Sequence, residues 1–371
     1  MAAFELPPVD ADRLRQLLRQ RLGCEAIGFA EAPTRLGQGG EAVVDGFSLR
    51  GLQDPGTPWN APLILRRLMP QRDPIQLRWE AAVHEALHGL GYPVPRVLAV
   101  ETDAAALGAP FLVAERVPGE VPLQAVMRPR ELARQPQRFP GVIAEALFRV
   151  PRLLAESQAW LHGLDPGPLR RGLAAAGLSA RELGFPAWLE RLASSIRDAR
   201  LEGLVPGLVW LEHHRPHEPR EVVCHGDFVF SNLCVAAGRV TGVFDWSTVA
   251  LAEPAWDVAA TLARLRSRVP GMPPWVDRIT QRVQAGMGRR YLAAYRRLAI
   301  RNGLTLDLDR LRYYGAYWIL YELTRSGERL RAGLVPGDAI EHRWLHLETI
   351  EKGVADFRRL AGVALAPLLP G

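Results

Sequence analysis

Lysine is almost absent from this chain of 371 residues. Lys352 is the only lysine, and all the other basic side chains are arginine. Asparagine is nearly as scarce, occurring at Asn60, Asn232 and Asn302 alone. The scarcity of both residue types beside abundant alanine, arginine, glycine and proline indicates a GC-rich coding sequence more than selection for a basic protein. Because the arginines are interleaved with acids and form no basic tail, the net charge of +6 does not predict nucleic-acid binding.

Cysteine and long apolar runs are also in short supply. Cys24, Cys224 and Cys234 form no C-x-x-C pair and no disulfide framework, which favours a reducing compartment. No apolar run is long enough to cross a membrane. The first residues already carry Glu5 and Asp10, where a signal peptide would be basic and then apolar. We therefore expect a soluble cytoplasmic protein without a membrane partner.

The apolar residues, 48% of the chain, can form a large core, and their periodicity predicts an α+β fold. Strand patterns occur mainly in the first third and helical patterns afterwards. Pro118 and Gly119 mark the expected boundary, which gives predicted domains at 1–118 and 119–371. Helical patterns cover residues 10–22, 74–90, 150–164, 256–267, 275–303, 307–332 and 339–361.

The most informative stretch runs from residue 221 to 257, EVVCHGDFVFSNLCVAAGRVTGVFDWSTVALAEPAWD. A short apolar strand precedes His225, Gly226 and Asp227. Two further apolar runs, separated by Ala-Ala-Gly, predict a β-hairpin. Asn232 stands just before the first strand of this hairpin and Asp245 just after the second, so we expect these two side chains to meet at its open end.

This arrangement suits metal-assisted phosphoryl transfer. The amide oxygen of Asn232 and the carboxylate of Asp245 are oxygen ligands of the kind that Mg²⁺ accepts, with waters and phosphates completing its shell. Asp227 then remains available to orient an attacking hydroxyl, as phosphoryl transfer requires. The plainer interpretation, a β-hairpin with polar ends, does not account for the combined spacing of all three residues.

The same residues resemble the signature of the aminoglycoside phosphotransferase family, which has the protein-kinase-like bilobal fold. The similarity is to the family's H-G-D-x-x-x-x-N catalytic loop, here starting at His225, and to its [IV]-x-D-W metal motif around Asp245. The resemblance implies that His225 and Asp227 belong to the catalytic residues, with Asp227 as the base. It further implies that Asn232 and Asp245 bind Mg²⁺ and that Asp257 is a structural acid.

The resemblance also implies a nucleotide site in the first domain, for ATP or GTP. The turn GQGG resembles a kinase glycine loop whose N–H groups face phosphates. Arg66 stands where kinases carry a strand-three lysine, with Glu80 as its expected helix partner. The glycine turn is not a P-loop, because the sequence Gly-Lys-Ser/Thr does not occur in the chain. The implied nucleotide-binding residues are Gly37, Gly39, Gly40, Arg66, Glu80 and, at the interlobe hinge, Ala114, Glu115 and Arg116.

Other functions stay open at this point. The arginine in place of lysine is compatible with a nucleotide-binding pseudokinase or regulator. His84, Glu85 and His88 match H-E-x-x-H, the pattern of a zinc hydrolase. The helix that carries them ends just after His88. A helical wheel places His88 away from the apolar side, so two solvent-exposed histidines are the better interpretation. The main prediction is a kinase that phosphorylates a hydroxyl of an unidentified small molecule, with unknown oligomeric state.

Overall fold

The computed structural model describes residues 6–38, 41–123, 135–217, 220–266, 274–334, 345–366 and 368. The chain divides into two compact units. The first comprises residues 1–120, 167–178 and 233–247, and the second comprises 121–166, 179–232 and 248–371. The first unit thus adds two later segments, among them the predicted hairpin, to the predicted domain 1–118. Among the described residues, no helix is both long and apolar enough to cross a membrane.

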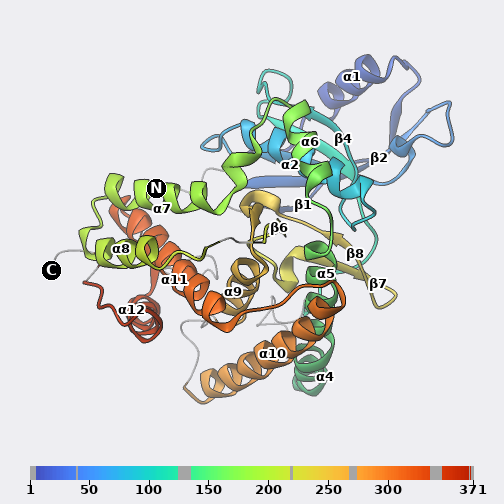
Figure 1. The fold of residues 1–371 in the computed structure, drawn as a ribbon. Coiled ribbons are helices and arrows are strands. Elements are labelled where there is room, and N and C mark those ends of the chain that lie inside the picture. The colour runs from blue at the N-terminus through green and yellow to red at the C-terminus, as the bar shows by residue number, and fades with distance from the viewer. Residues whose placement is uncertain are drawn as a thin grey trace. The chain divides into compact units, whose positions relative to one another are not determined.

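A five-stranded antiparallel sheet is the framework of the first unit (Figure 1). Its strand order is β1-β2-β3-β5-β4. Alternate residues of a strand point to opposite faces, and the two faces pack against different helices. Leu63 and Leu65 of β3 join a cluster with Leu14 and Leu18 of α1, whereas Ile64 packs on a cluster that contains Leu77 of α2. The elements are α1 (Ala11–Leu22), β1 (Gly28–Gln38), β2 (Ala42–Arg50), β3 (Leu63–Leu68), α2 (Ile75–Gly89), β4 (Val97–Glu101), β5 (Phe111–Glu115) and α6 (Gly167–Ala175).

The predicted hairpin is present in the first unit. It consists of β7 (Leu233–Ala236) and β8 (Arg239–Val243), with Leu233 paired with Val243. Ala237 and Gly238 both have positive φ, at 48° and 77°, as a type I′ turn requires. The turn therefore falls where the Ala-Ala-Gly sequence predicted it, and Asp245 follows the end of β8 by two residues.

The second unit is mostly helical. Within it, α5 packs against α10, and α11 packs against α9 and α12. A two-stranded sheet of β6 and β9 carries the chain into the His-Gly-Asp loop; β9 was not predicted from the sequence. The elements are α4 (Phe139–Ala144), α5 (Val150–His162), α7 (Phe185–Asp198), α8 (Val205–His213), β6 (Val222–Cys224), β9 (Ala250–Ala252), α9 (Pro254–Leu265), α10 (Pro274–Arg301), α11 (Leu308–Arg331) and α12 (Leu347–Ala361).

The aromatic stripe of α11 forms core. Tyr313, Tyr314, Tyr317 and Trp318 are each at most 4% exposed, and Phe185 of α7 lies edge-on to three of the tyrosine rings. Their burial agrees with the usual meaning of aromatic residues at helical spacing. Only Tyr321, the last member of the stripe, is partly exposed.

Candidate active site

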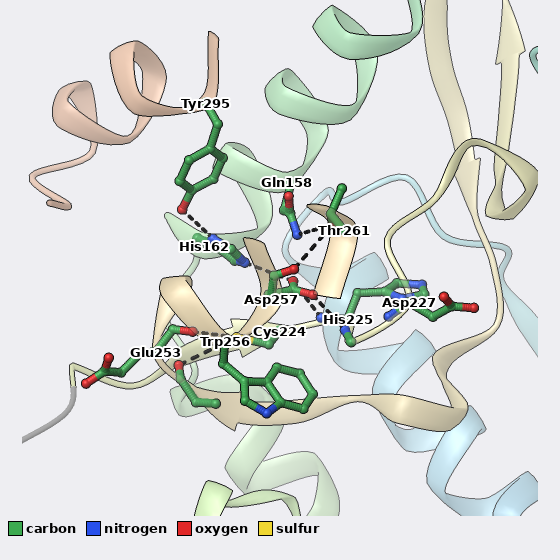
Figure 2. A network of polar contacts seen from close by, with 12 residues as sticks. Gln158, His162, Cys224, His225, Asp227, Glu253, Trp256, Asp257, Thr261 and Tyr295 are labelled. Carbon is green, nitrogen blue, oxygen red and sulfur yellow. Dashed lines mark hydrogen bonds and ion pairs between the residues drawn. The ribbon is translucent and has the colours of Figure 1, made fainter. Parts of the chain in front are cut away.

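The His-Gly-Asp loop is held in place by one buried carboxylate. Asp257, in the first turn of α9, accepts the backbone N–H of His225 at 2.9 Å and that of Gly226 at 2.7 Å (Figure 2). Its Oδ2 also contacts Nε2 of His162 at 3.0 Å, and Nδ1 of His162 contacts the hydroxyl of Tyr295. Burial alone would raise the pKa of Asp257, but the hydrogen bonds and charges of the two histidines outweigh burial and lower the pKa.

Gly226 can hardly be replaced in this loop. Its φ is 80°, and a Cβ there would lie 2.4 Å from the carbonyl oxygen of Thr248 and 2.8 Å from the ring of Trp256. The hydroxyl of Thr248 also donates to the carbonyl of His225 at 2.9 Å. The glycine of the motif is therefore required by both backbone conformation and close packing.

Asp227 and Asn232 are joined by hydrogen bonds. Nδ2 of Asn232 donates to the backbone carbonyl of Asp227 at 2.9 Å and to its Oδ2 at 3.1 Å. Because the amide nitrogen of Asn232 faces Asp227, its amide oxygen is turned away from these two bonds. That oxygen is a suitable ligand for a hard cation such as Mg²⁺.

His225 does not reach the surface. Its ring is completely buried, and its Nδ1 accepts the backbone N–H of Asp227 at 3.2 Å. Its side chain lies edge-on to Phe228. Grouped with the catalytic residues in the sequence analysis, His225 has contacts that support the loop and no exposed atoms to meet a substrate.

An arginine that was not predicted from the sequence forms an ion pair with Asp227, the predicted base. Arg264, near the end of α9, forms an ion pair with Oδ1 of Asp227 and a longer one, of 3.5 Å, with Glu322 of α11. Its guanidinium stands 4.7 Å above the ring of Trp318. Arg264 follows Asp257 by seven residues, two helical turns, so a helical wheel places both on the same face of α9. That spacing was the available signal.

In the first unit, Arg66 and Glu80 form the ion pair that the resemblance implied. The distance is 2.5 Å, and both side chains are less than a fifth exposed. Burial raises the pKa of Glu80; the charges of Asp245 and Glu41 act in the same direction, and Arg66 opposes them. Asp245 is therefore close enough to Glu80 for its charge to be felt.

Glu41 also contacts Arg66, together with a second arginine, Arg72. Glu41, directly after the glycine turn, lies 3.9 Å from Arg66 and 3.1 Å from Arg72. Neither Glu41 nor Arg72 was predicted from the sequence. Of the predicted glycines, Gly37 lies in β1, whereas Gly39 and Gly40 fall outside the described residues. The observed cluster is thus two arginines interleaved with two glutamates next to the turn.

Asp245 occupies a conformation that non-glycine residues rarely adopt, with φ of 61°. Such strain persists where surrounding contacts enforce it, and it is concentrated at functional sites. Here the contacts are the indole of Trp246, which donates to the carbonyl of Val243 at 3.1 Å, and the hydroxyl of Ser247, which donates to Oδ1 of Asp245 at 2.7 Å. Tyr92, after α2, stacks edge-on to Trp246.

The predicted hinge offers few free donors. The N–H of Glu115 donates to the carbonyl of Arg96 at 2.9 Å, and the N–H of Arg116 donates to that of Pro62 at 2.7 Å. Ala114 pairs with Ile64 within the sheet. Adenine recognition at this segment would therefore rely on carbonyl oxygens or on donors beyond Arg116.

The three residues of the H-E-x-x-H pattern on α2 do not share one environment, as the ligands of a zinc site would. His84 is 4% exposed and its Nδ1 contacts the carbonyl of Pro95 at 2.9 Å, whereas Glu85 and His88 are exposed. The expectation that both histidines are solvated is thus wrong for His84, because its ring packs inward against the segment after the helix.

Over the described residues, one group of potential ligands has metal spacing, namely His162, Cys224 and Asp257. It is completely buried. Asp257 and His162 already bond one another and other groups, and the thiol of Cys224 donates to the carbonyl of Glu253 at 3.5 Å (Figure 2). Burial raises the pKa of this thiol well above its usual range, which disfavours the thiolate that a metal needs. This group is a hydrogen-bond network.

Comparison with known proteins decides the family. Residues 50–301 match the phosphotransferase enzyme family, APH. The chain belongs to this family. Aminoglycoside 3′-phosphotransferase of Streptomyces fradiae is 30% identical over 199 residues, which cover 53% of this chain and 67% of that protein. Acyl-CoA dehydrogenase family member 11 of mouse is 26% identical over 187 residues, covering 48% of this chain and only 22% of the mouse protein.

Solved structures show the same fold. A putative aminoglycoside phosphotransferase from Ralstonia eutropha has a TM-score of 0.61 at 21% identity, over 95% of this chain and 99% of that one. A thermostable mutant of aminoglycoside phosphotransferase APH(4)-Ia, in complex with AMP-PNP and hygromycin B, has a TM-score of 0.51 at 18% identity, over 94% and 95% of the two chains. The APH-like fold with a β-rich first lobe and a helical second lobe is thereby confirmed.

Proposed function

We propose that this APH-family chain is a small-molecule kinase that transfers the γ-phosphoryl group of ATP to a hydroxyl. The observation that carries the proposal is the Asp227–Asn232 pair, pinned by the buried Asp257 network, in a chain that also has the Arg66–Glu80 ion pair. Membership of the phosphotransferase enzyme family supports the reaction class. The AMP-PNP bound to APH(4)-Ia supports ATP as the donor.

In the proposed reaction each residue has a limited task. Asp227 accepts a hydrogen bond from the acceptor hydroxyl and takes its proton as the new O–P bond forms and the bond from the γ-phosphorus to the β,γ-bridging oxygen breaks, which releases ADP. Arg66 and the N–H groups near the glycine turn hold phosphate oxygens. Phosphoryl transfer asks the protein mainly for positioning and charge stabilisation, and no covalent protein intermediate is needed.

Mg²⁺ fits the donor set. The amide oxygen of Asn232 faces away from Asp227, and Asp245 contributes a carboxylate of which Oδ1 is oriented by Ser247. An amide oxygen with a carboxylate is a ligand pair that Mg²⁺ accepts. When bound, Mg²⁺ would neutralise negative charge on the phosphates. We propose Asn232 and Asp245 as its ligands.

The acceptor is tested by a screen. Purified protein with MgATP would be incubated with neutral polyols, hydroxyl compounds that carry carboxylate or phosphate groups, and cationic amino sugars. ADP release and the mass of the phosphorylated acceptor are the measurements. Wild type should phosphorylate at least one class, and Asp227→Asn should lower turnover by about 10²–10⁴-fold, the typical contribution of a general base.

A matched control separates loss of the base from general damage. Asp309 is an exposed carboxylate in the first turn of α11, and Asp309→Asn should keep full turnover. Melting with MgATP completes the test, because ligand at 100 times its Kd stabilises by about 2.7 kcal/mol. A MgATP-dependent rise in Tm without turnover of any acceptor would contradict the kinase and leave the nucleotide-binding pseudokinase that the sequence kept open.

A further inference from the structure

Arg264 is held on three sides in the second unit. Its Nε binds Oδ1 of Asp227, its Nη2 lies 3.5 Å from Glu322, and its guanidinium covers the face of Trp318. The side chain is only 10% exposed. Glu322 and Trp318 both come from α11 and are four residues apart, so they form a single platform for the arginine on one face of that helix.

Burial of Arg264 is unfavourable by itself. Its Nη1 is buried and has no hydrogen-bond partner among the described residues. A buried polar group without a partner costs free energy, and removal of the guanidinium from water opposes its charge. Asp227 and Glu322 nevertheless raise the pKa of Arg264, so it stays charged. Unfavourable burial of this kind often occurs at functional sites, and here it occurs beside the proposed catalytic carboxylate of Asp227.

The contacts of Arg264 complete the immobilisation of Asp227. Asn232 binds Oδ2 of the carboxylate from one side, and Arg264 binds Oδ1 from the other. The backbone N–H of Asp227 is bonded to His225. Neither oxygen can rotate without breaking a charge-assisted bond, and the carboxylate remains 28% exposed toward solvent.

We propose that Arg264 is a positioning residue, which fixes the carboxylate of Asp227 in the direction from which it receives the acceptor hydroxyl. This inference rests on the proposed kinase function. A carboxylate held at one oxygen by a guanidinium and at the other by an amide keeps a fixed direction, so it can orient the acceptor hydroxyl. That suits a loose transition state in which little bonding to the nucleophile has developed.

A purely structural ion pair is the alternative, and the kinetic pattern separates the two. Arg264→Gln should lower kcat with the identified acceptor by about 100-fold, the scale of a misplacement of about 1 Å. The KM for MgATP and its effect on Tm should change less than twofold. Arg264→Lys should restore part of kcat, because it keeps the charge but lacks the planar fork.

Arg296, exposed on α10, is the matched control, and Arg296→Gln should leave all three quantities unchanged. A kcat within threefold of wild type in Arg264→Gln would overturn the proposal. Loss of the MgATP-dependent rise in Tm in Arg264→Gln would also overturn it, because the arginine would then support the fold or the nucleotide site. Full kcat in Arg264→Gln but not in Arg264→Lys would contradict positioning as well.

A second measurement distinguishes failure of the proposed kinase function from failure of the inference about Arg264. If wild type transfers phosphate to no acceptor and not to water, the kinase assignment fails, and the contact is tested by melting of Asp227→Asn, Arg264→Gln and the double variant. A Tm of the double variant that departs from additivity by about 2 °C or more supports the fixed pair. Additive Tm changes would show that Arg264 does not hold Asp227, and would overturn the inference.

Discussion

The two groups of candidate site residues are held by different physical means. In the second unit, the His-Gly-Asp loop is fixed by completely buried hydrogen bonds that converge on Asp257. In the first unit, Arg66 is held by ion pairs to Glu80 and Glu41 whose side chains are 14–32% exposed. In the first arrangement the bonded residues are buried away from water. In the second the side chains are partly exposed, so water can replace a lost partner.

This difference predicts different responses to change. A perturbed buried network should lose stability and turnover together, because no water can replace the lost partners. A perturbed ion-pair cluster should change ligand affinity and depend on salt, with a smaller effect on the free energy of unfolding. The following substitutions test this contrast, from the largest expected effect to the smallest.

Gly226→Ala should have the largest effect. The new Cβ would meet the carbonyl oxygen of Thr248 at 2.4 Å in a residue whose φ is 80°. Backbone strain and overpacking each cost about 1–3 kcal/mol, so we expect the free energy of unfolding to fall by about 4 kcal/mol, with turnover lost. Thermal and urea unfolding measure the first effect, and ADP release measures the second.

Gly238→Ala is the control for this prediction, because Gly238 has nearly the same φ, 77°, and no atom within 4 Å of an added Cβ. It should lose only about 1–2 kcal/mol, the cost of the left-handed conformation. Equal losses in the two variants would show that the close packing at Gly226 is unimportant.

Asp257→Asn should destabilise the protein by about 3 kcal/mol at neutral pH, because an amide cannot accept from all the donors that the carboxylate serves. Since the pKa of Asp257 is lowered in the folded state, its contribution is complete above the unfolded value and is lost as pH falls through the folded value. The Tm difference between wild type and variant should thus be constant above about pH 5 and shrink below about pH 4.

An Asp309→Asn variant, which changes an exposed carboxylate, should follow the wild-type curve within about 0.5 kcal/mol. A difference between wild type and Asp257→Asn that grew on acidification would contradict the lowered pKa. It would also remove the contrast between the two groups of residues.

The difference between the two groups also explains what the sequence could predict. Features set by neighbouring residues could be predicted: the helix over residues 10–22, observed as α1, and the β7–β8 hairpin follow from short local patterns. The Arg66–Glu80 pair was found because a family pattern joins positions 14 residues apart. Such signals depend on spacing, which a single sequence displays directly.

Contacts between distant segments were not accessible in the same way. Glu322 lies 58 residues beyond Arg264, and no periodicity links α9 to α11 in the sequence. The same holds for β9, whose three residues are too short for a pattern. The burial of His84 was missed because tertiary packing against Pro95, after the end of α2, decided it. Side-chain partners set by packing need the fold, whereas turns, caps and motif spacing do not.

Arg66→Ala should weaken MgATP binding by about 10–100-fold, because a charge-assisted hydrogen bond to phosphate contributes about 1.5–3 kcal/mol. The affinity that remains should depend less on salt than that of wild type, since one cation fewer faces the phosphates. Calorimetric titration at two ionic strengths measures both effects. Arg96→Ala, which removes an exposed arginine of the same unit, should leave the affinity unchanged; an equal loss there would assign the effect to general charge.

Glu41→Gln should have the smallest effect and the opposite sign. Glu41 lies 3.9 Å from Arg66 and 3.1 Å from Arg72, so under the proposed function its carboxylate would compete with phosphate oxygens for both cations. Replacement by the neutral amide should raise the affinity for MgATP by about two- to fivefold, the size of a partly exposed ion pair of 0.5–1 kcal/mol. Glu85→Gln, an exposed glutamate on α2, is the matched control and should change nothing. Weaker binding in Glu41→Gln would mean that Glu41 aligns the arginines for the nucleotide, and the first unit would then resemble the fixed network of the second.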